Sequence, residues 1–304
     1  MAITVVGSVA FDALETPAGK RDRCLGGAAT YFSLSASFFT DVRVIAVVGE
    51  DFGAEEQAVF DAKKIDTRGI EHAKGKSFFW AGSYMENLNE AQTRQTDLNV
   101  FASFNPKIPA EYADSGFLFL ANIDPVLQQR VRKSVPDVKL VAGDTMNYWI
   151  NGHRPALLEV LKGLDVLLIN DTETRILAGE QSLVKAARGV LAMGPKALVV
   201  KHGEYGATLF RQTPEKLEIF KAPAMPLEQV TDPTGAGDSF AGGFFGFLAS
   251  QSELTPAIFR RAMFYGSAMG SFACERFGTE RLQLLTRAEI DRRFKLFREL
   301  THLD

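Results

Sequence analysis

The chain has 304 residues, of which 46% are hydrophobic and 23% are charged, and these values are typical of a folded globular protein rather than a disordered or fibrous one. Its 34 basic and 37 acidic side chains give a formal net charge of −3 without a long Lys/Arg run, which argues against a nucleic-acid partner. Two cysteines, no signal-peptide pattern and no apolar run of roughly 18 to 20 residues argue against export and membrane insertion, so we expect a cytoplasmic protein.

Short apolar runs alternate with segments of helical length along most of the chain. Several runs are continuously hydrophobic, which is typical of strands that are buried on both faces of a parallel sheet. We therefore predict one α/β domain over residues 1–304, with a doubly wound, mostly parallel sheet flanked by helices. The expected strands are 3–9, 42–49, 117–121, 138–142, 165–169 and 197–201, and the expected helices are 27–39, 53–63, 125–135, 155–162, 182–193, 238–249, 255–274 and 287–299.

Two segments interrupt this alternation. Residues 10–24 are polar and contain a Pro-Ala-Gly turn, and residues 76–101 mix aromatic and polar side chains without a helical period. Both segments are typical of short antiparallel strands outside the main sheet. We expect them to form a small lid, discontinuous in sequence, of the kind that closes over a ligand. An edge hairpin with no moving part is the alternative.

The stretch TDPTGAGDSFAGGFFGFL, residues 231–248, combines a glycine-rich loop with the start of an apolar helix. The glycines let successive backbone N–H groups point at one spot, and the first four N–H groups of a helix are unpaired. The loop and the helix start therefore form an anion cradle that suits phosphate. Asp238 stands inside this cradle. It is either the N-cap of the helix or a general base that takes a proton from a hydroxyl attacking a phosphoryl group.

Two other glycine motifs fail on spacing. A dinucleotide-binding Gly-x-Gly-x-x-Gly would need Gly or Ala where the chain has Phe240, and it would open an N-terminal βαβ unit. Gly75-Lys76-Ser77 copies the end of a P-loop, but Ile70 occupies the position of the first glycine of that motif. We therefore expect neither a Rossmann nor a P-loop nucleotide site.

The segment DPTGAGDSFAGGF strongly resembles the C-terminal signature of the ribokinase-like kinases, also called the PfkB carbohydrate kinase family, and the resemblance extends over essentially the whole chain. It implies an α/β core, a β-strand lid, and ATP-dependent phosphorylation of a hydroxyl on a sugar, polyol or nucleoside. It also implies Asp238 as the general base, with the backbone N–H groups of Gly235, Ala236 and Gly237 as an anion hole for the phosphoryl group.

A sugar or polyol kinase is our first hypothesis for the function. A nucleoside kinase of the same family is the alternative, motivated by an aromatic-rich lid that could stack a base, and a non-catalytic ligand-binding relative is the third. The resemblance implies ATP and Mg²⁺ as cofactors, K⁺ in some members, and lids that can pair into homodimers.

The resemblance also assigns an acceptor site. Asp12, at the end of GSVAFD, would accept hydrogen bonds from substrate hydroxyls, with a strand-end turn as its alternative role, and Gly26 and Gly27 would let the backbone approach the substrate closely. Many sugar-specific members place an asparagine soon after the glycine pair, where this chain has Thr30 and Tyr31, which argues against ribokinase itself. The expected substrate-binding residues are Asp12, Gly26, Gly27, Thr30, Trp80 in the lid and Asn147 in the turn DTMNYWI.

The expected nucleotide and metal positions come from four further segments. Asn170-Asp-Thr-Glu173 matches the family's Asn-x-x-Glu motif, whose glutamate helps to hold Mg²⁺ mainly through water, although the same pattern is also a capping box. KHGEYG at 201–206 resembles the family's turn beside the nucleotide, with a plain hairpin turn as the alternative. Small residues around Ser267 would make room for a flat base or pack against another helix. The expected nucleotide-binding residues are Asn170, Lys201, Gly203, Gly206, Gly235 and Ser267, and the expected metal-binding residues are Glu173 for Mg²⁺ and Asp232 and Thr234 for a monovalent cation.

Overall fold

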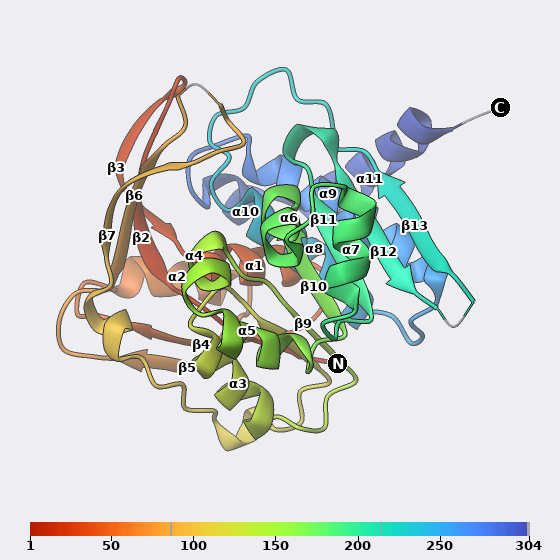
Figure 1. The fold of residues 1–304 in the computed structure, drawn as a ribbon. Coiled ribbons are helices and arrows are strands. Elements are labelled where there is room, and N and C mark those ends of the chain that lie inside the picture. The colour runs from red at the N-terminus through yellow and green to blue at the C-terminus, as the bar shows by residue number, and fades with distance from the viewer. Residues whose placement is uncertain (86, 214, 303–304) are drawn as a thin grey trace.

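Parallel strands form most of a nine-stranded sheet in the computed structural model, which describes residues 1–85, 87–213 and 215–302 (Figure 1). The first seven strands in the order given below are parallel to one another, and the last two extend the sheet on one side through antiparallel pairings. The predicted doubly wound, mostly parallel fold is confirmed. The order across the sheet is β5 (Asp66–His72), β4 (Val42–Val48), β1 (Ile3–Val6), β8 (Phe117–Leu120), β9 (Leu140–Gly143), β10 (Val166–Asn170), β11 (Ala197–Lys201), β12 (Ala207–Gln212) and β13 (Leu217–Ala222).

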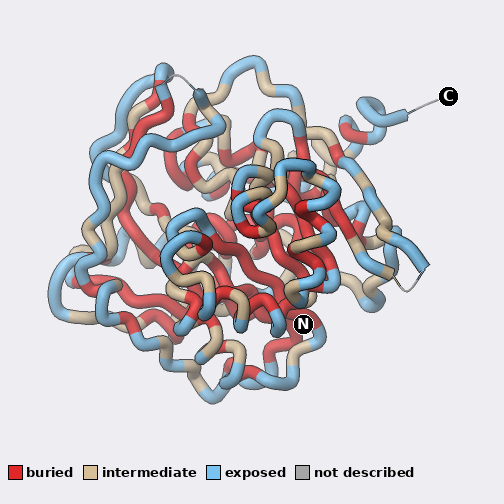
Figure 2. Tube along the Cα trace, viewed as in Figure 1, coloured by how far each residue is buried: buried red, intermediate tan, exposed pale blue. Residues whose placement is uncertain are grey.

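Helices cover both faces of this sheet and enclose two hydrophobic cores. Figure 2 shows buried residues concentrated along the strands and exposed residues on the outer sides of the helices. One face carries α1 (Ala28–Ala36), α2 (Ala54–Ala62), α8 (Ala236–Ala249), α9 (Pro256–Ala273), α10 (Glu280–Leu284) and α11 (Arg287–Thr301). The other face carries α3 (Pro125–Ser134), α4 (Asn147–Gly152), α5 (Arg154–Leu161), α6 (Asp171–Ala178) and α7 (Leu183–Leu191). Short 3-10 helices lie in the connections, at η1 (Asn99–Ser103), η2 (Ala110–Tyr112) and η3 (Gly203–Tyr205).

Helix α8 follows the glycine-rich loop and is buried over residues 239–249. It packs between α1 and α9, and its glycines permit close approach, because a Cβ at Gly242 would lie 2.3 Å from the carbonyl oxygen of Phe32. Its phenylalanines fill the core, where the rings of Phe245 and Phe119 lie 5.7 Å apart between centroids. The apolar, glycine-rich sequence therefore serves tight helix packing. In the described part of the chain, no helix combines the length and apolar character needed to cross a membrane.

A second sheet of four strands stands apart from the main sheet (Figure 1). Its outer pairs are antiparallel hairpins, as expected for segments 10–24 and 76–101, whereas its central pair is parallel. The reason is topological, because the two central strands follow β1 and β5, which are themselves parallel, and so both leave the main sheet in the same direction. The order in this small sheet is β3 (Gly19–Gly26), β2 (Ala10–Thr16), β6 (Phe78–Ser83) and β7 (Gln92–Asp97).

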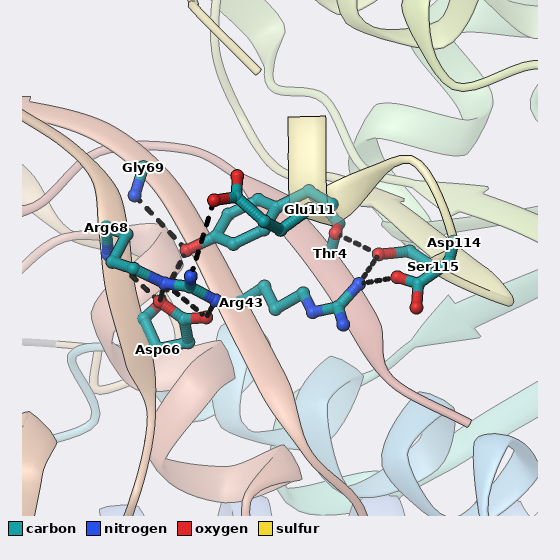
Figure 3. Close-up of polar contacts among 9 residues, drawn as sticks. Thr4, Arg43, Asp66, Arg68, Gly69, Glu111, Asp114 and Ser115 are labelled. Carbon is teal, nitrogen blue, oxygen red and sulfur yellow. Dashed lines mark hydrogen bonds and ion pairs between the residues drawn. The ribbon is translucent and has the colours of Figure 1, made fainter. Parts of the chain in front are cut away.

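The amino-terminal ends of the main-sheet strands carry a polar cluster that Figure 3 shows in close-up. The Tyr112 hydroxyl accepts a hydrogen bond from the Gly69 amide at 3.1 Å and donates one to Asp66 Oδ1 at 2.9 Å. Asp66 also pairs with Arg68 at 2.6 Å, and hydrogen bonding from Arg68 is the main cause that lowers the pKa of Asp66 to about 2. These contacts fill the point at which the pairing of β4 with β5 shifts register.

The same cluster continues from β4 to β1. Arg43 donates to the Ser115 hydroxyl at 3.0 Å and forms an ion pair with Asp114, and Ser115 shares a hydrogen bond of 2.6 Å with Thr4. These polar side chains have partners within the chain, so this edge of the sheet is a stabilising element. We call this group the amino-edge cluster, and it comprises Thr4, Arg43, Asp66, Arg68, Gly69, Glu111, Tyr112, Asp114 and Ser115.

Candidate active site

Buried and partly buried acidic side chains gather on the opposite side of the main sheet, around the carboxyl ends of its parallel strands. Asp238, in the first turn of α8, lies within electrostatic reach of Asp12 from β2, of Asp144 beyond β9 and of Glu173 on α6. Lys201, at the end of β11, adds a positive charge to the group. Open α/β sheets bind their ligands at this edge. The carboxyl-edge site comprises Asp12, Asp144, Glu173, Lys201, Asp232 and Asp238.

Asp238 occupies the first turn of α8 but does not cap the helix. The helix begins at Ala236 rather than at the predicted position 238, and its N-cap is Gly235. The N-cap interpretation of Asp238 is therefore wrong. Burial raises the pKa of Asp238, while the positive charge of Lys201 opposes that shift. A carboxylate with a raised pKa is a stronger base than an exposed one, so Asp238 is better suited to accept a proton than an ordinary aspartate.

The loop before α8 presents free amides beside the acidic cluster. Gly235 has a φ of 71°, a left-handed conformation that favours glycine. Of the three amides expected to form an anion hole, that of Ala236 donates to the Pro233 carbonyl oxygen at 3.2 Å, whereas those of Gly235 and Gly237 find no acceptor among the residues that the structure describes. A Cβ at Gly237 would lie 2.9 Å from Lys201 Nζ, so an ammonium group stands next to these amides. Free amides and a cation together make a site for an anion.

Asp12 lies inside β2, and not at the end of a strand as expected, so the strand-end interpretation of this residue is wrong. Its carboxylate turns toward the glycine pair before α1. The Gly27 amide interacts with it and opposes the rise of its pKa, and a Cβ at Gly26 would lie 1.9 Å from its Oδ2. Burial, followed by the charges of Asp232 and Asp238, raises the pKa of Asp12 to about 8. The carboxyl group of Asp12 therefore holds a proton at pH 7 when no ligand is bound.

Helix α1 adds hydroxyls that the protein leaves unpaired. Thr30 Oγ1 and the Tyr31 hydroxyl are buried, and no described residue forms a hydrogen bond with them. The ring of Tyr31 packs against the loop before α8, since a Cβ at Gly235 would lie only 2.3 Å from it. Asp144 Oδ1 and Thr234 Oγ1 are unpaired in the same sense. Buried polar groups are normally paired, so this set of unpaired oxygens indicates a site that a polar ligand completes.

Asp144 and Glu173 follow neighbouring strands, and both interact with Lys201. Asp144 comes directly after β9, and burial raises its pKa well above the ordinary value. Glu173 forms the expected capping box, in which its Oε2 accepts from the Asn170 amide at 2.8 Å and Asn170 Oδ1 accepts from the Glu173 amide at 2.7 Å. Burial also raises the pKa of Glu173. The cap uses one oxygen of Glu173 and leaves the other for a ligand.

The turn DTMNYWI, which begins at Asp144, was expected near the substrate, with Asn147 as its substrate-binding residue. Asn147 is exposed in the first turn of α4 and forms no hydrogen bond with the described residues, whereas Asp144 is buried. The signal that points to Asp144 rather than Asn147 is its place in the chain. It is the first polar residue after a buried parallel strand, just as Asn170 ends β10 and Lys201 ends β11, and such residues meet at the carboxyl edge of the sheet.

Asp232 is fully buried, and the backbone uses both of its carboxylate oxygens. Its Oδ1 accepts from the Thr234 amide at 2.9 Å, and its Oδ2 accepts from the Gly278 amide at 2.8 Å. The side chain therefore shapes the loop before α8 and ties it to the segment that follows α9. A monovalent cation at Asp232 and Thr234 stays a prediction.

The remaining predicted residues have structural contacts of their own. The Trp80 indole N–H donates to Thr93 Oγ1 at 3.2 Å within the small sheet. Gly203 and Gly206 form the turn between β11 and β12, which is the hairpin that we gave as the alternative. Ser267 is buried in α9, and its Oγ has no partner in the described chain. Their roles toward a ligand stay predictions.

The acidic cluster is not a closed metal cage. Within residues 1–85, 87–213 and 215–302, no group of three or more His, Cys, Asp and Glu side chains is arranged to hold a metal ion. Mg²⁺ keeps several waters and needs only one or two protein carboxylates. The unpaired Asp144 Oδ1 and the neighbouring carboxylate of Glu173 fit that requirement.

Comparison with known proteins connects this geometry to one family. The sequence pattern of the pfkB family carbohydrate kinases matches residues 12–285. The chain is 27% identical over 261 residues to a cytidine kinase of Thermococcus kodakarensis, which covers 84% of this chain and 90% of that protein. A nucleoside kinase of Burkholderia thailandensis in complex with inosine has a TM-score of 0.76 at 20% identity, covering 97% of this chain and 98% of that chain. An E. coli protein assigned as ribokinase II, in complex with ATP and Mg²⁺, has a TM-score of 0.77 at 21% identity, covering 97% of this chain and 99% of that chain. The two structural likenesses establish a common fold.

Proposed function

The chain belongs to the pfkB family of carbohydrate kinases and is a phosphotransferase with an alcohol group as acceptor, and we propose that it transfers the γ-phosphoryl group of ATP to a hydroxyl of a sugar or polyol. A nucleoside acceptor is the second candidate, which the match to a cytidine kinase over 84% of this chain favours. The observation that carries the proposal is Asp238, a partly buried carboxylate that does not cap its own helix and lies next to free amides.

Asp238 acts in this proposal as the general base. It takes the proton of the acceptor hydroxyl while the hydroxyl oxygen attacks the γ-phosphorus. A new P–O bond forms, the bond from the γ-phosphorus to the bridging oxygen breaks, and ADP leaves with that oxygen. The raised pKa of Asp238 supports this role, because a base works best when its pKa approaches the working pH.

Charge on the transferring phosphoryl group is stabilised by the loop before α8. The free amides of Gly235 and Gly237 and the nearby Lys201 ammonium supply the donors. The Ala236 amide already donates to the Pro233 carbonyl oxygen. It therefore holds the loop in shape and does not contact the phosphoryl group directly. The proposed anion hole thus has two backbone donors and one cation.

The acceptor binds between the small sheet and the core. Asp12, held by the backbone at Gly26 and Gly27, accepts hydrogen bonds from acceptor hydroxyls, and the unpaired hydroxyl of Thr30 lies in the same region. The small sheet acts as a lid that excludes water during transfer, and Trp80 belongs to it. Support for a polyhydroxylated acceptor comes from the number of buried polar oxygens that the protein leaves unpaired.

Asn170 at the end of β10, Gly203 and Gly206 in the turn after β11, and Ser267 in α9 would bind ATP. Asp144 and Glu173 would hold the Mg²⁺ that accompanies the nucleotide, partly through water. When bound, Mg²⁺ neutralises charge on the phosphates. Support for both cofactors comes from the similar E. coli fold in complex with ATP and Mg²⁺.

ADP release measured across a panel of sugars, inositols and nucleosides, with ATP and Mg²⁺, tests the proposal. We expect saturable release with at least one polyhydroxylated acceptor. Saturation by nucleosides alone would replace the sugar or polyol by the second candidate. No release above background with any acceptor would favour a non-catalytic ligand-binding role.

A further inference from the structure

Tyr84 reaches from the small sheet into the carboxyl-edge site. It directly follows β6, and its amide donates to the carbonyl oxygen of Glu15 on β2 at 2.9 Å, which fixes its backbone to the neighbouring strand. Tyr84 is 9% exposed, whereas the next residue, Met85, is 47% exposed. The side chain of Tyr84 is therefore turned inward at the exposed end of a strand.

The phenol of Tyr84 lies among polar groups from three other elements. It approaches the hydroxyl of Thr234 in the loop before α8 and the carboxyl groups of Asp232, Asp12 and Asp238. Thr234 Oγ1 nevertheless has no hydrogen-bond partner within 3.5 Å in the described chain. Burial raises the pKa of Tyr84, so the phenol keeps its proton near neutral pH and is a hydrogen-bond donor.

More polar groups surround the phenol of Tyr84 than the phosphoryl transfer itself requires. One hydroxyl of the acceptor loses its proton to Asp238, yet Asp12, Tyr31 and Thr234 also lie near Tyr84, and the hydroxyls of Tyr31 and Thr234 have no partner in the described chain. Buried donors and acceptors without partners are costly unless a ligand pairs with them. The site is therefore built to contact more hydroxyls than the single one that reacts.

We propose that Tyr84 is a specificity-determining residue that donates a hydrogen bond to a non-reacting hydroxyl of the acceptor, one of a diol whose other hydroxyl is bound by Asp12. This inference rests on the proposed function and narrows its substrate class. The acceptor carries a diol besides the hydroxyl that is phosphorylated, as ribosyl compounds and furanose sugars do. Deoxy compounds are rejected by the same contact, because a site built to hydrogen-bond a hydroxyl discriminates strongly against the analogue without it.

The test crosses one enzyme change with one substrate change. Wild type and Tyr84→Phe are assayed with ribose and 2-deoxyribose, and with cytidine and its 2′-deoxy and 3′-deoxy analogues. In the wild type, removing the contacted hydroxyl lowers kcat/KM by about tenfold to hundredfold. Tyr84→Phe lowers kcat/KM for the intact acceptor by a similar factor, and its own deoxy penalty shrinks to about twofold, because the two changes remove the same hydrogen bond. A deoxy penalty that is unchanged in Tyr84→Phe overturns the proposal.

Tyr112→Phe is the matched control. It removes the hydroxyl of a buried tyrosine at the amino edge, whose partners are Gly69 and Asp66, and it keeps the deoxy penalty of the wild type. Calorimetric titrations of wild type and Tyr84→Phe with the same acceptors, without ATP, make the same comparison for binding affinity alone. If nothing is phosphorylated but the affinities show a deoxy penalty that depends on Tyr84, the proposed function fails and the Tyr84 contact is supported. Equal wild-type affinities for each acceptor and its deoxy analogues overturn the Tyr84 proposal.

Discussion

The amino and carboxyl edges of the main sheet both carry tyrosine hydroxyls and carboxylates, but they pair them differently. At the amino edge, the Tyr112 hydroxyl accepts from Gly69 and donates to Asp66. At the carboxyl edge, the Tyr31 hydroxyl is buried and has no partner in the described chain. The carboxylates follow the same division, since hydrogen bonding from Arg68 lowers the pKa of Asp66 to about 2 while burial raises the pKa of Asp12 to about 8.

This difference separates stability from function along a single sheet. Polar groups that the protein satisfies contribute to folding whether or not a ligand is present. Polar groups that await a ligand cannot be satisfied by the protein, and their burial reduces stability in the free state. Changes at the amino edge should therefore lower stability and leave turnover largely unchanged. Changes at the carboxyl edge should lower turnover and leave stability unchanged or raise it.

The largest effect is expected for Asp238→Asn at the carboxyl edge. Turnover should fall by at least about a hundredfold because the amide cannot take the proton of the acceptor, while ATP binding is retained. Steady-state kinetics and a nucleotide titration measure the two effects. Asp66→Asn is the control at the amino edge, and it should lower stability while keeping kcat within about twofold. Wild-type turnover in Asp238→Asn would contradict the proposed mechanism.

The pH dependence of stability should have opposite signs at the two edges. Asp12 keeps its proton in the folded state up to about pH 8 but releases it near its ordinary value of 3.8 when unfolded, so stability falls as pH rises between these values. Asp66 has a folded pKa of about 2, so its contribution is present above its ordinary value of 3.8 and is lost as pH falls toward 2. Each slope is at most about 1.4 kcal/mol per pH unit.

Urea unfolding of the free protein over a pH series measures both slopes. Asp12→Asn should flatten the decline between pH 4 and 8, and Asp66→Asn should flatten the loss of stability at acidic pH. If Asp12→Asn left the decline unchanged, another group would carry it, and the protonated state assigned to Asp12 would be incorrect.

A tyrosine pair gives the most direct comparison of the two edges. Tyr112→Phe removes a hydroxyl with two partners and should lower the free energy of unfolding by about 1–3 kcal/mol, since it leaves the Gly69 amide unpaired. Tyr31→Phe removes a hydroxyl without a partner and should leave stability unchanged or raise it. Chemical denaturation measures both variants, and equal losses would show that pairing is not what distinguishes the edges.

Sequence patterns predicted the buried strands because burial on both faces leaves a continuous apolar run. The runs at Val42–Val48 and Ala197–Lys201 became β4 and β11 with little change of bounds. The strands that were not predicted are β5 and β13, which are the outermost strands of the main sheet, and β12, which lies next to β13. The sequence of β5, DTRGIEH, is polar because an edge strand is open to solvent on one side, so no apolar run identifies it.

The candidate site was predictable where a motif fixes both residue type and spacing. Asp238 and Gly235 belong to such a motif. The family resemblance that assigned the glycine pair to the acceptor site also assigned Asp12 to it. The turn after β9 was predicted to lie at the site, but the sequence pattern did not distinguish Asp144 from its exposed neighbour Asn147. Tyr84 belongs to the predicted lid segment 76–101, but its burial depends on how the small sheet sits over the loop before α8.

The smallest effect should distinguish two glutamates that have the same role in helix capping. Glu173 and Glu289 both occupy the third position of a capping box, at the starts of α6 and α11. Replacing either by glutamine keeps a side-chain oxygen that can still accept the capping hydrogen bond, so stability should change by no more than about 1 kcal/mol. Glu173→Gln should nevertheless raise the Mg²⁺ concentration for half-maximal activity by about tenfold, because a negative ligand beside Asp144 is lost. Glu289→Gln should leave that concentration unchanged. Magnesium titrations of both variants measure the difference, and an equal response would mean that Glu173 serves the helix alone and that Mg²⁺ is held without it.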